Sequence, residues 1–106
     1  MCGFVGLYLN DNYNIEVRKL VSILNNMTNT LAHRGPDHKG IYTNEKDKLA
    51  FGFQRLSIID LQSSANQPMI SKNKDWVIVF NGEIYNYKNL KEKLRTKKNY
   101  WKSNSD

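Results

Sequence analysis

The apolar residues of segment 17–31 recur at intervals of three and four residues, and this pattern constrains the fold more than any other. They are Val17, Leu20, Val21, Leu24, Met27 and Leu31. Residues spaced in this way share one face of an amphipathic helix. Gly35-Pro36 follows the series, and a glycine-proline pair is typical of the end of a helix. The sequence therefore predicts a helix over most of the segment 17–31.

Apolar runs rich in β-forming residues surround this helix and predict strands. The runs are residues 4–9, 40–43, 49–53, 55–61 and 76–80. The polar segment 62–73, which contains Pro68, is expected to be a loop, and Tyr87, Leu90 and Leu94 indicate a second, short helix. The order strand, helix, several strands, helix favours an α+β or layered architecture over alternating parallel βαβ units.

Length and composition indicate a single domain, or part of one. The single cysteine, Cys2, excludes an internal disulfide framework and gives no support for a zinc site built from several cysteines. No apolar run approaches the roughly 18 residues that a membrane span needs, and the N-terminus does not read as a signal peptide. We therefore expect a cytoplasmic protein that has no membrane partner.

A basic stretch, residues 88–102, accounts for nearly all of the net charge of +6. It contains Lys88, Lys91, Lys93, Arg95, Lys97, Lys98 and Lys102 against the acid Glu92. Such a run can contact nucleic acid. It is more often a solvated helix face followed by a loop, so we expect no nucleic-acid partner.

Cys2 follows the initiator methionine directly. Removal of Met1 would give this residue both a thiol and a free α-amine. Thiols and α-amines exchange protons readily near neutral pH, and an N-terminal nucleophile assisted by its own amine is a known form of covalent catalysis. The alternative is a small apolar residue that opens a strand.

Asn81-Gly82 lies between two apolar, aromatic-rich runs, where this pair is a strong signal for a hairpin turn. The same pair offers a side-chain amide and an unobstructed backbone N–H. Two such donors aimed at one point form an oxyanion hole. The turn is favoured by the segment alone, and the two interpretations are compatible.

The segment Arg34-Gly35-Pro36-Asp37 has turn chemistry, and its arginine and aspartate could pair across the turn. His33 and His38 flank it at a spacing that fits no metal-ligand pattern, so we expect loop histidines and no metal.

Arg55 opens an apolar run, where its planar fork could receive a carboxylate. The alternative is a surface ion pair with Asp60 or another acid.

Six segments together resemble the glutaminase domain of glutamine-hydrolysing asparagine synthetases, a class II glutamine amidotransferase domain. In chain order they are Cys2-Gly3-Phe4-Val5-Gly6, His33-Arg34-Gly35-Pro36-Asp37, Arg55-Leu56-Ser57-Ile58-Ile59-Asp60, Gln67-Pro68-Met69, Asn81-Gly82-Glu83-Ile84-Tyr85-Asn86-Tyr87 and Ser105-Asp106. The resemblance covers the whole chain. It implies the N-terminal-nucleophile fold, a four-layer αββα sandwich, of which residues 1–106 would be the incomplete N-terminal half.

The resemblance also implies a role for each site residue. Cys2 would attack the side-chain amide of glutamine, and Asn81 and Gly82 would hold the oxyanion. Arg55 would bind the substrate α-carboxylate. The pocket would be lined by Leu56, Ser57, Ile58 and Ile59, and the α-ammonium would be received by Glu83 and Asp106.

The implied product, ammonia, would feed ATP-dependent conversion of aspartate to asparagine in a synthetase domain absent from these residues. ATP and magnesium are expected only there, so no cofactor is expected in this segment. The expected partners are glutamine, the synthetase domain and, in the parent protein, a second copy.

Two departures from the family pattern limit these expectations. Phe53-Gln54 stands before Arg55, where many members have a His-Arg pair, and the chain stops at Asp106, a predicted substrate contact. We expect weak glutaminase activity, or none, from the isolated chain. The alternatives are an amidotransferase paralogue that feeds another acceptor, such as a sugar, and an inactive fragment or interaction module.

Overall fold

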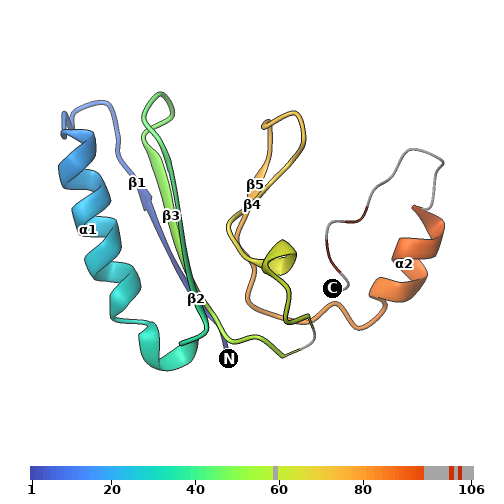
Figure 1. The fold of residues 1–106 in the computed structure, drawn as a ribbon. Helices are drawn as coiled ribbons and strands as arrows, with labels where there is room; N and C mark the ends of the chain where they lie inside the picture. Colours follow the sequence, from blue (N-terminus) through green and yellow to red (C-terminus); the bar gives the residue numbers. More distant parts are fainter. Residues whose placement is uncertain (59, 95–100, 102, 104–106) are drawn as a thin grey trace.

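The structure, a computed structural model, describes residues 1–58, 60–94, 101 and 103 (Figure 1). The helices in it are α1 (Val17–Asn29) and α2 (Tyr87–Lys93), with the short 3-10 helices η1 (Ala32–Arg34) and η2 (Ser63–Ala65). The strands are β1 (Gly3–Tyr8), β2 (His38–Asn44), β3 (Leu49–Arg55), β4 (Met69–Ile70) and β5 (Val77–Ile78).

β3 is the central strand of an antiparallel sheet in the order β1-β3-β2, and β4 pairs separately with β5. Figure 1 shows α1 against one side of the larger sheet and the β4–β5 hairpin beyond the other side. This arrangement is a mixed α and β architecture with antiparallel sheets, as the order of the elements predicted. It is compatible with part of an N-terminal-nucleophile domain.

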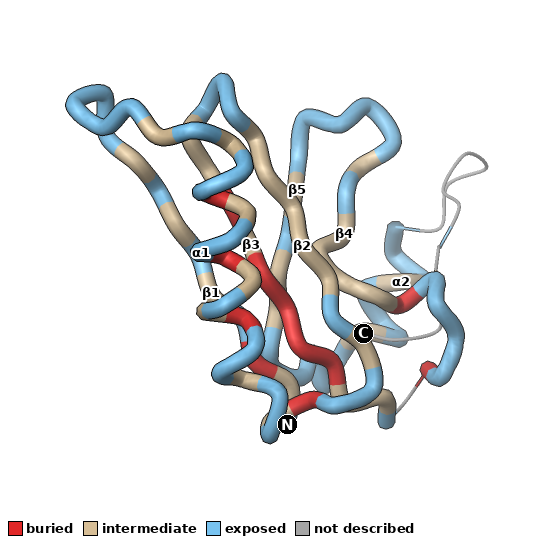
Figure 2. Tube along the Cα trace, turned by 60° about the vertical axis from the view of Figure 1, so that its left-hand side comes forward, coloured by how far each residue is buried: buried red, intermediate tan, exposed pale blue. Residues whose placement is uncertain are grey.

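The apolar face of α1 packs on the sheet and forms the core. Leu20, Leu24 and Ala50 are its buried centre, with Val5, Leu7, Leu9, Ile15 and Ile41 packed around them. Figure 2 shows the buried residues along β3 and on the side of α1 that faces it. Near the end of the helix, Thr28 lies so close to β3 that a Cβ at Gly52 would be 1.9 Å from its Oγ1. The periodic apolar series thus fixes one face of the sheet.

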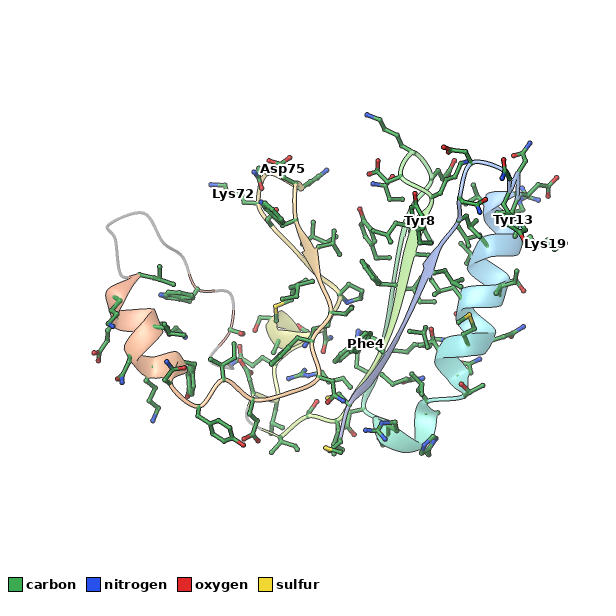
Figure 3. All side chains as sticks on the ribbon, turned by 180° about the vertical axis from the view of Figure 1, so that it is seen from behind. Phe4, Tyr8, Tyr13, Lys19, Lys72 and Asp75 are labelled. Carbon is green, nitrogen blue, oxygen red and sulfur yellow. The ribbon has the colours of Figure 1, made fainter. Side chains whose placement is uncertain are left out.

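The opposite face of β1 is less covered. The side chains of Phe4 and Tyr8 alternate with the core residues and are 49% and 74% exposed (Figure 3). Phe53 of β3, which is paired with Phe4 across the two strands, is fully buried. At the far end of the sheet an exposed ion pair of 3.3 Å joins Lys48 to Asp11.

Most predicted elements are confirmed with shifted ends. The first helix ends at Asn29 and is followed by the separate turn η1, and the second helix, α2, runs from Tyr87 to Lys93. The strands predicted over 4–9, 40–43 and 49–53 are confirmed as β1, β2 and β3. No helix in the described part of the chain has the length and apolar character required to cross a bilayer.

Three local predictions are wrong or only partly right. The described residues of segment 55–61 form no strand of their own, because β3 ends at Arg55 and Asp60 and Gln62 then bind the Arg55 side chain. The expected loop 62–73 contains η2 and β4, and the strand expected over 76–80 shortens to β5.

The Asn81-Gly82 hairpin is also absent. β5 pairs with β4 across the turn that precedes it, and the chain runs on from β5 through Asn81 and Gly82 into α2. None of the glycines has the positive φ that a hairpin turn of that type uses.

Candidate active site

The Cys2 thiol lies against the backbone of Leu56, at the end of the sheet where the N-terminus meets the end of β3. The Leu56 N–H donates to Sγ at 3.3 Å, and the thiol donates to the Leu56 carbonyl at 3.5 Å. The β1–β3 register explains this contact, because it pairs Gly3 with Gln54 and so places Cys2 beside the residues that leave β3. Cys2 is a free, half-buried thiol.

The segment 34–37 holds this end of the sheet from a third direction. The Arg34 Nε donates to the Cys2 carbonyl at 3.1 Å. The Asp37 N–H donates to the Arg55 carbonyl at 3.0 Å, and the Asp37 carboxylate accepts from the Ser57 N–H at 2.7 Å. Arg34 and Asp37 therefore have separate partners, and the predicted pairing across the turn is wrong. Arg34 thus binds the residue that precedes β1, and Asp37 binds the backbone on either side of Leu56.

Gly35 permits this arrangement because it lies directly on the end of β3. A Cβ at Gly35 would be 2.5 Å from the Arg55 carbonyl carbon and 2.6 Å from the Gln54 carbonyl oxygen. Its φ of −158° is extended backbone, which any residue adopts. The absence of a side chain, rather than special dihedral angles, is what this position requires.

The guanidinium of Arg55 is turned into the loop that follows β3. Its Nη1 donates to the Gln62 carbonyl at 3.0 Å and to the Asn66 Oδ1 at 2.8 Å, and its Nη2 donates to the Asp60 carbonyl. The side chain is 7% exposed, so these bonds form in a nearly dry environment, where charge-assisted bonds are strong. In this structure, Arg55 organises the loop 60–66, and its predicted role toward a substrate carboxylate stays a prediction.

Asn81 and Gly82 follow β5 and are both exposed. The residue before them, Phe80, is bonded by its backbone to the side chain of Gln67: Phe80 N–H to Oε1 at 2.6 Å, and Nε2 to the Phe80 carbonyl at 3.1 Å. The Phe80 ring covers Gly82, where a Cβ would be 2.8 Å from the ring. The pair is therefore an exposed donor set with fixed backbone on its N-terminal side.

The structure brings together only some of the predicted site residues. Cys2 contacts Leu56, while no hydrogen bond within the described residues joins Cys2 to Asn81. Ile58 is 72% exposed, and Glu83 is also exposed. The predicted roles of Ile59 and Asp106 fall outside the described residues.

The two histidines occupy different settings. His33 is exposed, and its Nδ1 lies 3.0 Å from the Thr30 carbonyl, while His38 begins β2 and is half-buried. The described residues contain no group of three or more His, Cys, Asp or Glu side chains that could hold a metal ion.

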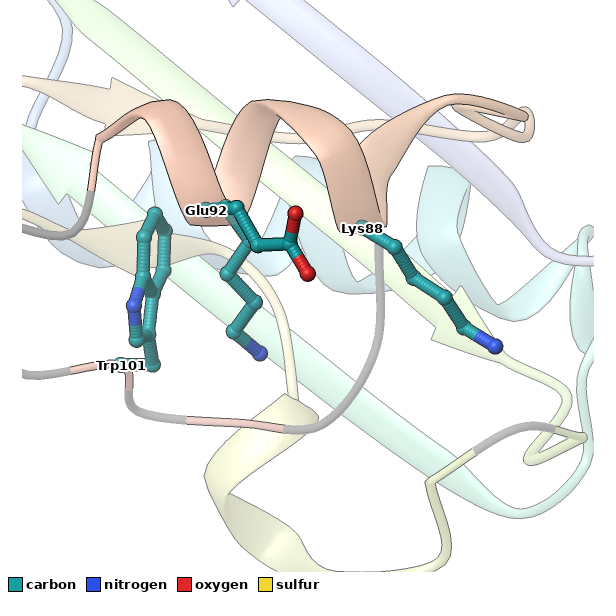
Figure 4. A pocket seen from close by; sticks show the side chains of 4 residues that line it. Lys88, Glu92 and Trp101 are labelled. Atoms are coloured by element: carbon teal, nitrogen blue, oxygen red, sulfur yellow. The ribbon is translucent and has the colours of Figure 1, made fainter.

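An open depression of about 350 Å³ lies between α2 and Trp101 (Figure 4). Its lining comprises Lys88, Lys91, Glu92 and Trp101. The Lys91 Nζ lies 5.2 Å from the centre of the Trp101 ring and donates to the Ser103 carbonyl at 3.2 Å. None of these residues belongs to the predicted site, so this depression and the Cys2 thiol are separate features.

Sequence comparison gives the family of the chain. A family model described as a glutamine amidotransferase domain matches residues 1–106. The chain belongs to this family. Its predicted resemblance to asparagine synthetases is confirmed by the curated relatives.

The relatives of this glutamine amidotransferase domain include "Asparagine synthetase [glutamine-hydrolyzing] 1" of Bacillus subtilis, which is 39% identical over all 106 residues. "Asparagine synthetase [glutamine-hydrolyzing] 1" of Arabidopsis thaliana is 37% identical over 92% of the chain. "Amidase chry2" of Gibberella zeae is 33% identical over 89% of the chain. The chain spans 16%, 16% and 15% of the length of these proteins.

The roles of Arg34, Asp37, Asn66 and Gln67 in organising this region were not predicted from the sequence. Arg34 and Asp37 were visible as charged residues beside a turn, and Gln67 was visible as part of a motif shared with the family. Arg34, Asp37 and Gln67 bind backbone atoms of other segments, and Asn66 binds the Arg55 side chain, so composition and spacing carry no signal for the contacts themselves.

Proposed function

We propose that the chain is the glutamine-hydrolysing part of an asparagine synthetase. The observation that carries the proposal is Cys2: a half-buried thiol at the second position of a glutamine amidotransferase domain, in contact with the Leu56 backbone. Met1 is 75% exposed, which leaves it accessible to an aminopeptidase. Its removal would place an α-amine on the same residue as the thiol.

In the proposed reaction the Cys2 sulfur attacks the side-chain carbonyl carbon of glutamine, and the thiol proton passes to the α-amine. The carbonyl oxygen gains negative charge and accepts hydrogen bonds from the Asn81 side chain and the Gly82 N–H. The C–N bond then breaks, the amine returns a proton to the leaving nitrogen, and ammonia departs. Water attacks the remaining thioester, which releases glutamate and restores the thiol.

Binding of a free amino acid needs one cation and one anion, because glutamine carries an α-carboxylate and an α-ammonium. We assign the carboxylate to Arg55, through the N–H groups that its loop bonds leave over, and the ammonium to Glu83 and Asp106. The pocket wall is assigned to Leu56, Ser57, Ile58 and Ile59. The bonds of the Leu56 and Ser57 N–H groups to Cys2 and Asp37, which fix their backbone, support this assignment.

The further steps belong to the whole protein. We propose that the ammonia converts aspartate to asparagine in an ATP-dependent synthetase domain outside these residues, with magnesium and ATP bound there. We further propose a four-layer αββα domain, a cytoplasmic location and a homodimeric parent protein. The names of the Bacillus subtilis and Arabidopsis thaliana relatives, of which the chain spans 16%, support the proposed synthesis of asparagine.

The test compares Cys2→Ala and Cys2→Ser with the unaltered sequence, in the full-length protein that contains these residues. Both variants are expected to lose glutamine-dependent asparagine synthesis and to keep synthesis from added ammonia. Intact mass checks that Met1 is absent from the active protein. A diazoketone analogue of glutamine should label Cys2, which is the one thiol of residues 1–106, and Cys2→Ala should abolish that adduct.

Glutamine hydrolysis by Cys2→Ala at an unaltered rate would refute the nucleophile. Glutamate release without asparagine from aspartate would retain the glutaminase and point to the paralogue with another acceptor. A protein in which neither substitution changes any activity would be the interaction module.

A further inference from the structure

We propose that Gln67 is a positioning residue for the oxyanion donors, because its side-chain amide fixes the backbone from which Asn81 and Gly82 extend. The inference rests on the proposed glutaminase function. Gln67 binds Phe80, the residue immediately before the pair, at both of its backbone polar groups, as donor at 3.1 Å and as acceptor at 2.6 Å.

The register of the β4–β5 hairpin explains why this contact is unusual. Met69 pairs with Ile78, so continuation of the ladder by two residues would place Gln67 opposite Phe80. In a regular antiparallel ladder the backbone N–H and carbonyl of residue 67 would bind the backbone of residue 80. Here the side-chain amide of Gln67 makes both bonds instead. It takes the place of one rung of the sheet.

Because the side chain makes these bonds, the Gln67 backbone can pack on the larger sheet. A Cβ at Gly40 of β2 would be 1.8 Å from the Gln67 carbonyl oxygen and 3.0 Å from the Pro68 Cδ, so the two backbones are in direct contact. The preceding residue, Asn66, accepts from Arg55 at 2.8 Å. Gln67 is therefore anchored on the β2–β3 side and reaches Phe80 with its side chain.

Asn81 and Gly82 themselves make no hydrogen bond within the described part of the chain, and both are exposed. Their directions are thus inherited from Phe80. Donors to an oxyanion act only when they point at the position where the charge develops, and loss of one such donor lowers kcat by about 10²–10³. A change at Gln67 should therefore alter the transition state more than the binding of glutamine.

The experiment measures steady-state glutamine hydrolysis in the full-length protein that contains these residues. Gln67→Met removes both bonds at similar side-chain length. Gln67→Glu keeps the acceptor for the Phe80 N–H but, when ionised, presents a second oxygen to the Phe80 carbonyl. Asn89→Asp makes the same amide-to-carboxylate change on an exposed face of α2 and is the matched control.

For both Gln67 variants we expect kcat to fall about tenfold to a hundredfold with KM within about twofold, and no change for the control. The Gln67→Glu variant should recover relative to the unaltered protein as the pH falls through the carboxyl range, because the protonated acid can donate to Phe80 again. Gln67→Met should show no such recovery. Circular dichroism checks that each variant is folded. If Gln67→Met does not fold, the pH dependence of the kcat of Gln67→Glu, relative to the unaltered protein, decides the question.

Three outcomes separate this inference from the proposed function. If the unaltered protein is active, the Gln67 variants have a lowered kcat and Gln67→Glu recovers at low pH, the positioning role is supported. An active protein whose folded Gln67 variants match the Asn89 control overturns the role and leaves the glutaminase standing. An unaltered protein that does not hydrolyse glutamine overturns the proposed function, and the role of Gln67 falls with it.

Discussion

Replacement of Gly35 by alanine should destabilise the protein strongly, because this glycine lies on the backbone of the central strand. The new methyl group would be 2.5 Å from the Arg55 carbonyl carbon. Carbon atoms pack at about 3.5–4.0 Å, so the two backbones must separate by roughly 1 Å. β3 is bonded on both sides, to β1 and β2, and cannot retreat. The segment 34–37 must therefore move.

The size of the effect follows from two contributions. Overpacking in a tight site costs about 1–3 kcal/mol, and loss of the bond from the Asp37 N–H to the Arg55 carbonyl adds about 0.5–1.5 kcal/mol. A domain of this size loses about 4–8 °C in Tm per kcal/mol. We expect Gly35→Ala to lower Tm by roughly 10 °C or more.

Gly6→Ala is the matched control, since a Cβ there would be 3.4 Å from the Phe51 Cε1, in ordinary contact. It should leave Tm unchanged or raise it slightly, because alanine restricts the unfolded chain by about 0.4–1 kcal/mol relative to glycine. Thermal unfolding followed by circular dichroism at the helix band measures both variants. Equal Tm changes for the two substitutions would refute the close-approach argument.

Three further predictions test other contacts. Gly52→Ala should lower the free energy of unfolding by about 1–3 kcal/mol, because the new Cβ would be 1.9 Å from the Thr28 Oγ1. Adding Thr28→Ala should recover part of that loss, and a double-mutant cycle of urea unfolding measures the coupling. Arg34→Ala should slow diazoketone labelling of Cys2 about tenfold, since it removes the donor to the Cys2 carbonyl, and equal labelling rates would contradict this. Asp11→Asn should leave Tm unchanged, because the ion pair it breaks is exposed, and a clear fall in Tm would show that the pair stabilises the fold.

The core and its elements could be predicted from the sequence because their signals are local. The helical spacing of Leu20 and Leu24 identified the face of α1 that is buried on the sheet. The strand predicted over 55–61 was wrong, because apolar residues occur both in strands and in loops that surround a side chain. Ile58 and Leu61 of that run are 72% and 77% exposed, which a buried strand would not allow.

The hairpin signal failed for a different reason. Asn-Gly predicts a turn only where the backbone adopts positive φ, and the turn that joins β4 to β5 instead places Lys74 at a φ of 64°. Hydrogen bonds close this turn, which contains no glycine: the Trp76 N–H donates to the Ser71 Oγ, and the Ser71 N–H donates to the Trp76 carbonyl. The turn forms where two strands can pair, and pairing partners are not visible in local composition.

The candidate site divides in the same way. Cys2 could be recognised from its position alone, because removal of Met1 would give the same residue a free α-amine beside its thiol. Its contact with Leu56 could not be predicted, since it follows from the β1–β3 register, which depends on the whole sheet. Gln67 in isolation looks like any polar loop residue, and only its two bonds to Phe80 give it a role.

The two halves of the proposed site, Cys2 with its neighbours and the Asn81-Gly82 pair, are held by different kinds of contact, and this should decide how each responds to substitution. The part around Cys2 is fixed by the pairing of β1 with β3 and by the close packing of Gly35 on the β3 backbone. A substitution in this part must therefore disturb the sheet itself. The donor half depends on one side-chain amide, which can be altered while the sheet stays intact. Substitutions beside Cys2 should therefore lower stability and catalysis together. Substitutions at Gln67 should lower kcat while Tm changes little, and that contrast locates the adjustable part of the site in the loop before β4.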